Sequence, residues 1–248
     1  MTVKRLILWL LPTLFLVGCG DEKTEIHIAA ASSLTEVMVP VTDAFERENP
    51  EYEIVPTYSA SGTLKDQILQ GSRADIFVSA DPRWVDELEE AHMLEDRVDL
   101  LGNRLVLVSP TERDWVIDEL TDLPSMHEME TIAIGNPDLV PAGAHARAAL
   151  EEAGLYDMLE DKFVFSGDVR TAMQYVETDN TDAAFVYETD ALASGSVRSD
   201  LIIDTPEPIV YPAALMEDRE QEEAGAFYAF LQEEEALQIF REHGFQIP

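Results

Sequence analysis

The chain has 248 residues, with 50 Asp or Glu against 16 Lys or Arg, so its formal net charge is −34. Such an acidic chain argues against nucleic acid as a partner, because phosphate backbones are bound by basic surfaces. The single Cys excludes an intrachain disulfide. With 46% hydrophobic residues, the chain is long enough for one large or two small domains with a substantial core.

The acidic excess has two interpretations, solubility alone or adaptation to a saline habitat. At about 1 M salt, charges further apart than roughly 3 Å are screened from one another, which relieves the self-repulsion of an acidic surface. The saline interpretation therefore predicts that the melting temperature of the protein rises with salt concentration. A melting temperature that does not rise with salt contradicts the saline interpretation.

The N-terminal segment has the pattern of a bacterial secretory signal. Lys4 and Arg5 precede an apolar run over residues 6–17, which is too short to span a bilayer comfortably. We therefore expect residues 1–18 to be a signal peptide that is removed from the mature protein.

Residues 16–19 read LVGC, which resembles a lipobox. Cleavage before Cys19 would leave this residue as a lipid-bearing N-terminus, with residues 19–24 as a short tether. More than one acyl chain gives stable membrane anchoring, so an extracytoplasmic, lipid-anchored protein is expected, in the periplasm or at the cell surface. The alternative is an ordinary cleavage site with an incidental Cys.

Strand and helix patterns alternate along the first half of the mature chain. Asp81 and Pro82 give a strong helix start, since Asp caps the helix and Pro tolerates the first helical position. This order is typical of an α/β fold. The predicted elements are strand 25–30, helix 34–48, strand 52–58, helix 63–70, strand 75–79 and a helix opening at 81–82.

The alternation continues to the C-terminus. Gly154 is a plausible C-terminal helix cap, and Pro206, Pro208 and Pro212 interrupt the segment that follows the last predicted strand. The predicted elements are strands 105–109 and 131–135, helix 141–153, strand 162–165, a helix after Asp168, strands 183–187 and 202–204, and helices 221–231 and 234–242.

Four strand-to-helix junctions carry small or hydroxyl residues where a helix begins. Free backbone N–H groups and the positive end of the helix dipole make each a potential anion site. Taken alone, each is more simply an ordinary helix cap, and the pairing of Ser33 with Glu36 in a capping box predicts this for the first. The junctions read AAASSL at 29–34, YSASGTL at 58–64, VPAG at 140–143 and GDVR at 167–170.

Open α/β sheets bind ligands beyond the carboxyl ends of their strands, which is where all four junctions would lie together. Their convergence favours one anion site over four unrelated caps. His residues are dispersed, and no zinc, P-loop, dinucleotide or nucleophile-elbow motif is present, so an enzyme or a metal site with direct protein ligands has little support.

Seven segments taken in order resemble the periplasmic molybdate-binding proteins, ModA-type, of ABC importers. The resemblance covers essentially the mature chain. The segments are AAASSLTE at 29–36, ADIFVSAD at 74–81, LLGNRLVLV at 100–108, GNPDLVPAG at 135–143, DVR at 168–170, AFVYETDA at 184–191 and IFREHGF at 239–245.

The resemblance implies a two-lobed class II solute-binding fold with the ligand in the cleft between the lobes. One lobe would comprise residues 24–105 plus 209–248, and the other residues 106–208. It also implies a non-enzymatic, monomeric protein without a cofactor that delivers molybdate or tungstate to an importer permease with its ATPase.

The resemblance further implies that five neutral donors hold the oxyanion. Ser33 and Ser61 would donate from hydroxyl and backbone, Ala142 and Val169 from backbone N–H groups, and Tyr187 from its phenol. Such a site has no acceptor for a proton, so it should disfavour protonated phosphate species.

Other ligands remain open on the same fold: sulfate, phosphate, ferric iron, a small organic acid, or a sensor role. Iron would need clustered Tyr residues, which the chain scatters. A carboxylate ligand would usually need an Arg, and the side chain of Arg170 should turn away from the site on its helix. Asp168 would repel a dianion unless its carboxylate turns back onto its own helix.

Overall fold

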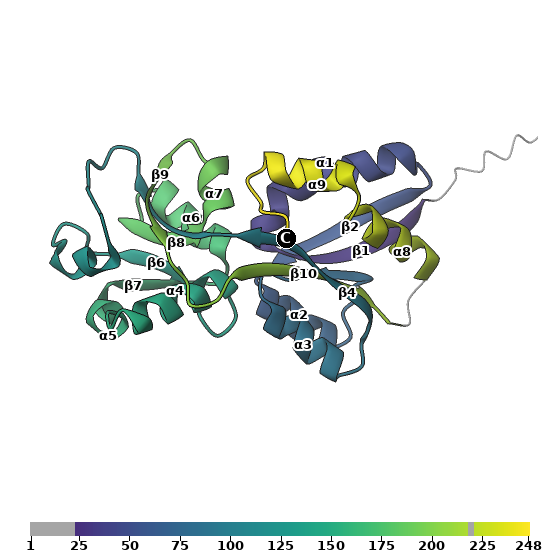
Figure 1. Ribbon diagram of the computed structural model, residues 1–248, viewed down its shortest axis with the longest axis horizontal. Coiled ribbons are helices and arrows are strands. Elements are labelled where there is room, and N and C mark those ends of the chain that lie inside the picture. The colour runs from purple at the N-terminus through teal and green to yellow at the C-terminus, as the bar shows by residue number, and fades with distance from the viewer. Residues whose placement is uncertain (1–22, 218–220) are drawn as a thin grey trace, which may run out of the picture.

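The computed structural model describes residues 23–217 and 221–248. The chain forms two lobes, each built on one five-stranded sheet with helices on both faces (Figure 1). Lobe 1 has the strand order β2-β1-β3-β10-β4, and lobe 2 has the order β7-β6-β8-β5-β9. The predicted α/β fold with two lobes is confirmed. The predicted signal peptide and Cys19 lie outside the described residues.

Lobe 1 is built from the N-terminal segment together with the C-terminal one. β1 pairs with β2 and β3 in parallel, while β10 runs antiparallel between β3 and β4. Its elements are β1 (Thr24–Ala31), η1 (Ser32–Leu34), α1 (Thr35–Glu48), β2 (Tyr52–Ser59), α2 (Ser61–Leu69), β3 (Ile76–Val78), α3 (Pro82–Glu90), β4 (Leu94–Asn103), β10 (Ile209–Met216), α8 (Gln221–Phe230) and α9 (Glu234–Glu242).

Lobe 2 repeats this plan with the central part of the chain. β6 pairs in parallel with β7 and β8, and β5 runs antiparallel to β8 and β9. Its elements are β5 (Leu105–Pro110), η2 (Leu120–Ser125), β6 (Ile132–Gly135), α4 (Pro141–Glu152), α5 (Tyr156–Leu159), η3 (Glu160–Lys162), β7 (Phe163–Ser166), α6 (Val169–Glu177), β8 (Ala183–Tyr187), α7 (Glu188–Ala193) and β9 (Val197–Ile203).

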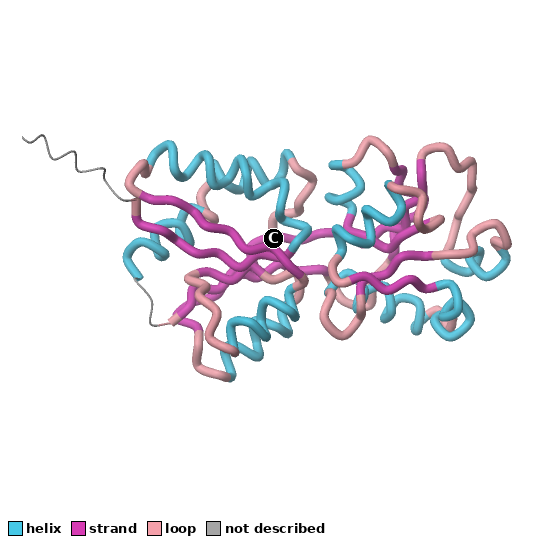
Figure 2. The backbone as a smooth tube through the Cα atoms, turned by 180° about the vertical axis from the view of Figure 1, so that it is seen from behind, coloured by secondary structure: helices cyan, strands magenta, loops and turns pink. Residues whose placement is uncertain are grey.

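Two segments join the lobes, and they lie near one another at the centre of the molecule (Figure 2). The first is the passage from β4 to β5 at Arg104, and the second is residues 204–208 between β9 and β10. The C-terminal segment returns to the same region, where Gly102 and Gln246 form an isolated bridge. The lobe boundaries predicted from the sequence, at 105/106 and 208/209, stay a prediction.

Two strands were not predicted, and both belong to lobe 1. β4 carries charged residues along an edge of the sheet, so its pattern does not alternate cleanly. β10 contains Pro212, one of the three Pro residues that interrupt this segment of the sequence. The structure accommodates this Pro at an irregularity between Tyr211 and Pro212 in the pairing with β4. No helix in the described part of the chain is long and apolar enough to cross a membrane.

Candidate functional site

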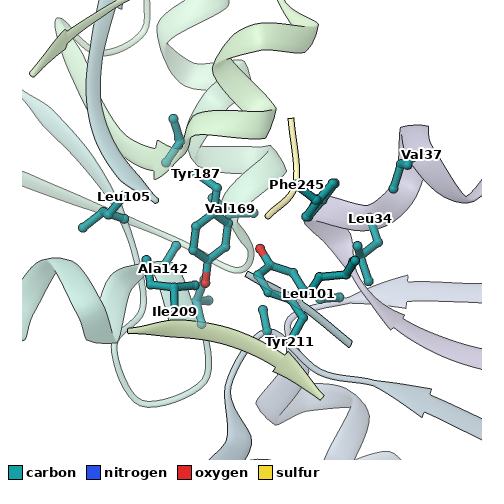
Figure 3. Close-up of a cluster of buried hydrophobic side chains, with 14 of the residues drawn as sticks. Leu34, Val37, Leu101, Leu105, Ala142, Val169, Tyr187, Ile209, Tyr211 and Phe245 are labelled. Carbon is teal, nitrogen blue, oxygen red and sulfur yellow. The ribbon is translucent and has the colours of Figure 1, made fainter. Parts of the chain in front are cut away.

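The junctions singled out in the sequence surround one small cavity between the lobes. Its lining includes all five predicted donors, contributed by both lobes. Figure 3 shows the Tyr187 ring next to Ala142 and facing Tyr211 in this region. The lining residues are Ala31, Ser32, Ser33, Ser59, Ala60, Ser61, Ala80, Val140, Pro141, Ala142, Val169 and Tyr187.

Ser33 lies in the 3₁₀ turn η1 between β1 and α1, and it does not cap a helix. The predicted capping box is wrong, because no side chain caps either helical segment here and the Ser33 hydroxyl instead bonds to Tyr211 Oη at 3.0 Å. The tight turn carries Ser33 towards β10, away from the first turn of α1. Its hydroxyl is therefore held by tertiary structure.

Ser61 is the first residue of α2, which begins two residues before the predicted start. Its Oγ accepts a hydrogen bond from the backbone N–H of Ala80 at 3.0 Å. Because a backbone N–H can only donate, the Ser61 hydroxyl keeps its own hydrogen for another partner. Ser61 is fully buried at the cavity.

Lobe 2 contributes two helix N-termini. α4 begins at Pro141 with no side-chain cap, and α6 begins at Val169 after the cap residue Asp168. N–H groups of the first helical turn have no partner within the helix, so those of Ala142 and Val169 are open to a ligand. The helix dipoles add positive potential at the same place.

Tyr187 ends β8 and is 1% exposed. Its hydroxyl has no hydrogen-bond partner among the described residues, although its ring meets Tyr211 edge-on at 5.6 Å between centroids. Burial raises the pKa of Tyr187 well above its usual value, so the phenol stays protonated and remains a donor. A buried hydroxyl without a partner at a cavity wall is a position where a ligand is expected to accept a hydrogen bond.

Asp168 and Arg170, two charged residues close to the cavity, are turned to other partners. Asp168 Oδ1 accepts from Thr171 N at 2.8 Å, so its carboxylate turns back onto its own helix. Arg170 pairs with Glu36 at 2.8 Å and does not line the cavity. Burial raises the pKa of Asp190 to about 7, which reduces negative charge beside the site.

The lobes are in contact over the cavity. Gly62 N donates to Leu139 O across the cleft at 3.0 Å. A Cβ on Gly62 would lie 2.8 Å from that carbonyl oxygen and 3.1 Å from Trp84 Cζ2, so only Gly allows this approach. The structure therefore has the closed arrangement of the cleft. Within the described residues, no three His, Cys, Asp or Glu side chains are grouped to hold a metal ion.

Two further residues beside the cavity were not predicted, Tyr211 and Asn103. Tyr211 lies in β10 and Asn103 ends β4, the two strands that the sequence patterns did not predict. The motif at 100–108 includes Asn103, but its letters do not indicate that the side chain turns towards Tyr211.

Comparison with known proteins identifies the same class of protein by family model and by sequence identity. A family model described as bacterial extracellular solute-binding protein matches residues 26–246. The chain is 36% identical over 247 residues to YvgL of Bacillus subtilis (strain 168), named as an ABC transporter substrate-binding lipoprotein, covering 94% of this chain and 93% of that protein. It is 34% identical over 233 residues to the molybdate-binding protein ModA of Escherichia coli (strain K12), covering 91% and 90%.

The solved structure of the Azotobacter vinelandii periplasmic molybdate-binding protein superposes with a TM-score of 0.79. It covers 90% of this chain and 99% of that one at 23% identity, so this comparison supports the fold alone.

Proposed function

Because the chain belongs to the ModA-type group of the bacterial extracellular solute-binding proteins, we propose that it captures molybdate, and tungstate with it, for an ABC importer. It is an extracytoplasmic binding protein of such a transporter and not an enzyme, and the bound anion is cargo and not a cofactor. An importer permease with its ATPase is the partner that this role implies.

The observation that carries the ligand proposal is the cavity lined by neutral donors from both lobes. A deprotonated dianion accepts several charge-assisted hydrogen bonds, each worth about 1.5–3 kcal/mol, without needing a cation. The hydroxyl of Tyr187 has no other partner among the described residues, and Ser61 keeps its hydrogen because Ala80 N–H occupies its acceptor side. Molybdate and tungstate share this charge and shape, so the site is expected to take both.

Selectivity follows from what the cavity lacks. A protonated phosphate needs an acceptor for its hydrogen, and it would face donors here. Sulfate is smaller, so rejection of sulfate depends on the fit of the closed cavity. A carboxylate ligand finds no Arg in the lining, since Arg170 pairs with Glu36 outside it.

A thermal unfolding screen tests the ligand. A ligand that binds only the folded protein stabilises it by about 2.7 kcal/mol at 100 times its Kd. We expect molybdate and tungstate to raise the unfolding temperature, and sulfate and phosphate to leave it unchanged at equal concentration and ionic strength. A rise with sulfate or phosphate alone would assign the site to a different anion.

Closure of the cleft supplies the signal for transport. The bound anion bridges the lobes and stabilises the closed state, whose surface the importer recognises; its differential affinity for that state drives the change. The membrane anchor at Cys19 and a monomeric state complete the proposal. The name of the Bacillus subtilis relative as a lipoprotein supports the anchor.

Gly62→Ala is expected to weaken molybdate binding by about tenfold. The added Cβ raises the free energy of the closed state relative to the open state, so a smaller fraction of the protein is able to bind. The new Cβ meets Leu139, which lies in the other lobe, at 2.8 Å. Gly167→Ala is the matched control, since a Cβ there has no atom within 4 Å. Titration of both variants compares them, and equal affinities would show that the Gly62 contact does not limit closure.

Asp168→Asn is expected to bind molybdate at least as tightly as the wild type. Asn keeps an oxygen to cap Thr171 N and removes a negative charge near the dianion. Asp157→Asn, which removes an exposed charge from α5, controls for the change in net charge. Markedly weaker binding by Asp168→Asn alone would mean that the carboxylate contributes to the site.

A further inference from the structure

A chain of hydrogen bonds runs behind the cavity from Ser33 into the junction of the lobes. Ser33 Oγ and Tyr211 Oη are 3.0 Å apart, Tyr211 Oη and Asn103 Nδ2 are 3.3 Å apart, and Asn103 Nδ2 is 2.9 Å from Thr189 Oγ1. All four residues are buried, with Tyr211 at 0% and Asn103 at 6% exposure. Of the four, Ser33 lines the cavity.

One end of this chain has a fixed direction. Arg104 donates its backbone N–H to Asn103 Oδ1 at 2.8 Å. A backbone N–H cannot accept, so the oxygen of the Asn103 amide must be on this side. The amide nitrogen therefore faces Thr189 and Tyr211, and it has one hydrogen for each of them.

The donor role of the Asn103 amide nitrogen determines the role of Tyr211. An amide NH₂ has no acceptor capacity, so Tyr211 Oη accepts from Asn103. We infer that its own hydrogen goes to Ser33 Oγ, because the 3.0 Å contact with Ser33 has hydrogen-bond geometry and the contact with the nearby Tyr187 hydroxyl does not. Ser33 Oγ thereby accepts the Tyr211 hydrogen, and the Ser33 hydrogen is left to point into the cavity. Burial raises the pKa of Tyr211 far above its usual range, which keeps the hydroxyl protonated.

We propose that Asn103 and Tyr211 are positioning residues that hold the Ser33 hydroxyl as a donor, and so make the site specific for an oxyanion that carries no proton. This rests on the proposed function and deepens it. A Ser hydroxyl left alone rotates and offers either a hydrogen or a lone pair. Fixing its direction before the ligand arrives stabilises the bound dianion and leaves a protonated anion without an acceptor.

The two serines of the site are oriented by different means. Ser61 accepts from a backbone N–H, that of Ala80, within the same lobe. Ser33 is oriented by side chains, and the chain ends on Thr189 of α7 in lobe 2. The direction of the Ser33 hydroxyl therefore depends on residues at the junction of the lobes, where Asn103 precedes the passage from β4 to β5.

A double-mutant cycle tests the positioning role through Ser33. Tyr211→Phe is expected to weaken molybdate binding by about tenfold in the otherwise wild-type protein. In the Ser33→Ala background the same change should cost less than about twofold, because no hydroxyl remains to be oriented. An equal loss in both backgrounds would mean that Tyr211 acts on the fold in general, and would overturn the proposal.

Tyr228→Phe is the matched control. It removes a buried phenolic hydroxyl from α8 of lobe 1, outside the cavity lining. Its molybdate affinity should equal that of the wild type, and in the Ser33→Ala background it should equal that of Ser33→Ala alone. This control separates loss of the Tyr211 hydroxyl from loss of any buried hydroxyl.

A neutron structure of the ligand-free protein, exchanged into deuterium oxide, decides the same question without a ligand or a variant. The proposal predicts the Tyr211 deuterium between Tyr211 Oη and Ser33 Oγ, bonded to Tyr211. A deuterium bonded to Ser33 and directed at Tyr211 would overturn it. Failure of the wild type to bind molybdate would count against the proposed function. The neutron result tests only the direction of the hydrogen bonds between Asn103, Tyr211 and Ser33.

Discussion

Val169→Pro is expected to weaken molybdate binding by about 100-fold while α6 keeps its structure. Val169 is the first residue of α6, and Asp168 before it is extended (φ −159°, ψ 170°). Pro suits this position because the N–H it lacks has no partner within the helix. The substitution thus removes one donor to the dianion, a hydrogen bond worth about 1.5–3 kcal/mol, and puts a ring carbon in its place.

Val169→Ala is the matched control, since it keeps the N–H and shortens the side chain. Calorimetric titration of both variants measures the effect, and circular dichroism confirms the helix content. α4 already has Pro141 at its first position, which shows that this fold accepts Pro there. Wild-type affinity in Val169→Pro would mean that this N–H does not contact the ligand.

Gly143→Ala is expected to destabilise the protein by about 3 kcal/mol, as overpacking of a close contact does. A Cβ on Gly143 would lie 1.9 Å from Gly135 O and 2.6 Å from its carbonyl carbon. α4 would have to move away from the end of β6, and the N–H of Ala142 would move with it. Molybdate binding should therefore fall together with the free energy of unfolding, measured in urea.

Gly225→Ala is expected to change the free energy of unfolding in the opposite direction. Gly225 lies inside α8, where a Cβ meets no atom within 4 Å. Ala in a helix interior is favoured over Gly by about 1 kcal/mol, so this variant should be more stable than the wild type. Equal effects of the two substitutions would contradict the steric explanation for Gly143.

The sequence predicted the parts of the fold that local patterns determine. The strand at 183–187 and the helix at 234–242 have the predicted bounds, and Asp81 caps α3 through Arg83 N as expected. The convergence of the junctions could be predicted because parallel strands place their carboxyl ends at one edge of a sheet. That rule applies within each lobe, so it does not by itself bring two lobes together; the family resemblance supplied that step.

What could not be predicted depends on tertiary contacts. Ser33 has the letters of a helix cap, and only the position of Tyr211 on β10 shows why its hydroxyl turns elsewhere. Pro212 interrupts the strand pattern of β10 in the sequence, although a strand tolerates it beside an irregularity in the pairing with β4. The amide of Asn103 has its direction from the backbone of Arg104, a contact that no spacing in the sequence encodes.

The electrostatic character of the site contrasts with that of the molecule. The chain has a formal net charge of −34, yet its proposed ligand is an anion. The contradiction is resolved by distance and orientation, because acids close to the cavity are turned away or raised in pKa while N–H and O–H dipoles face inward. Salt screens the long-range repulsion and leaves the buried hydrogen bonds largely intact.

The central claim is that this cavity binds a tetrahedral oxyanion without a proton, and one calorimetric experiment tests it most directly. The soluble mature chain, begun after Cys19, is titrated at high salt with molybdate, tungstate, sulfate and phosphate in turn. The account predicts tight one-to-one binding of molybdate and tungstate and no heat of binding from sulfate or phosphate. No heat of binding from any of the four anions, or a preference for sulfate or phosphate, would contradict the proposed ligand. The fold and the family would be unchanged by that result.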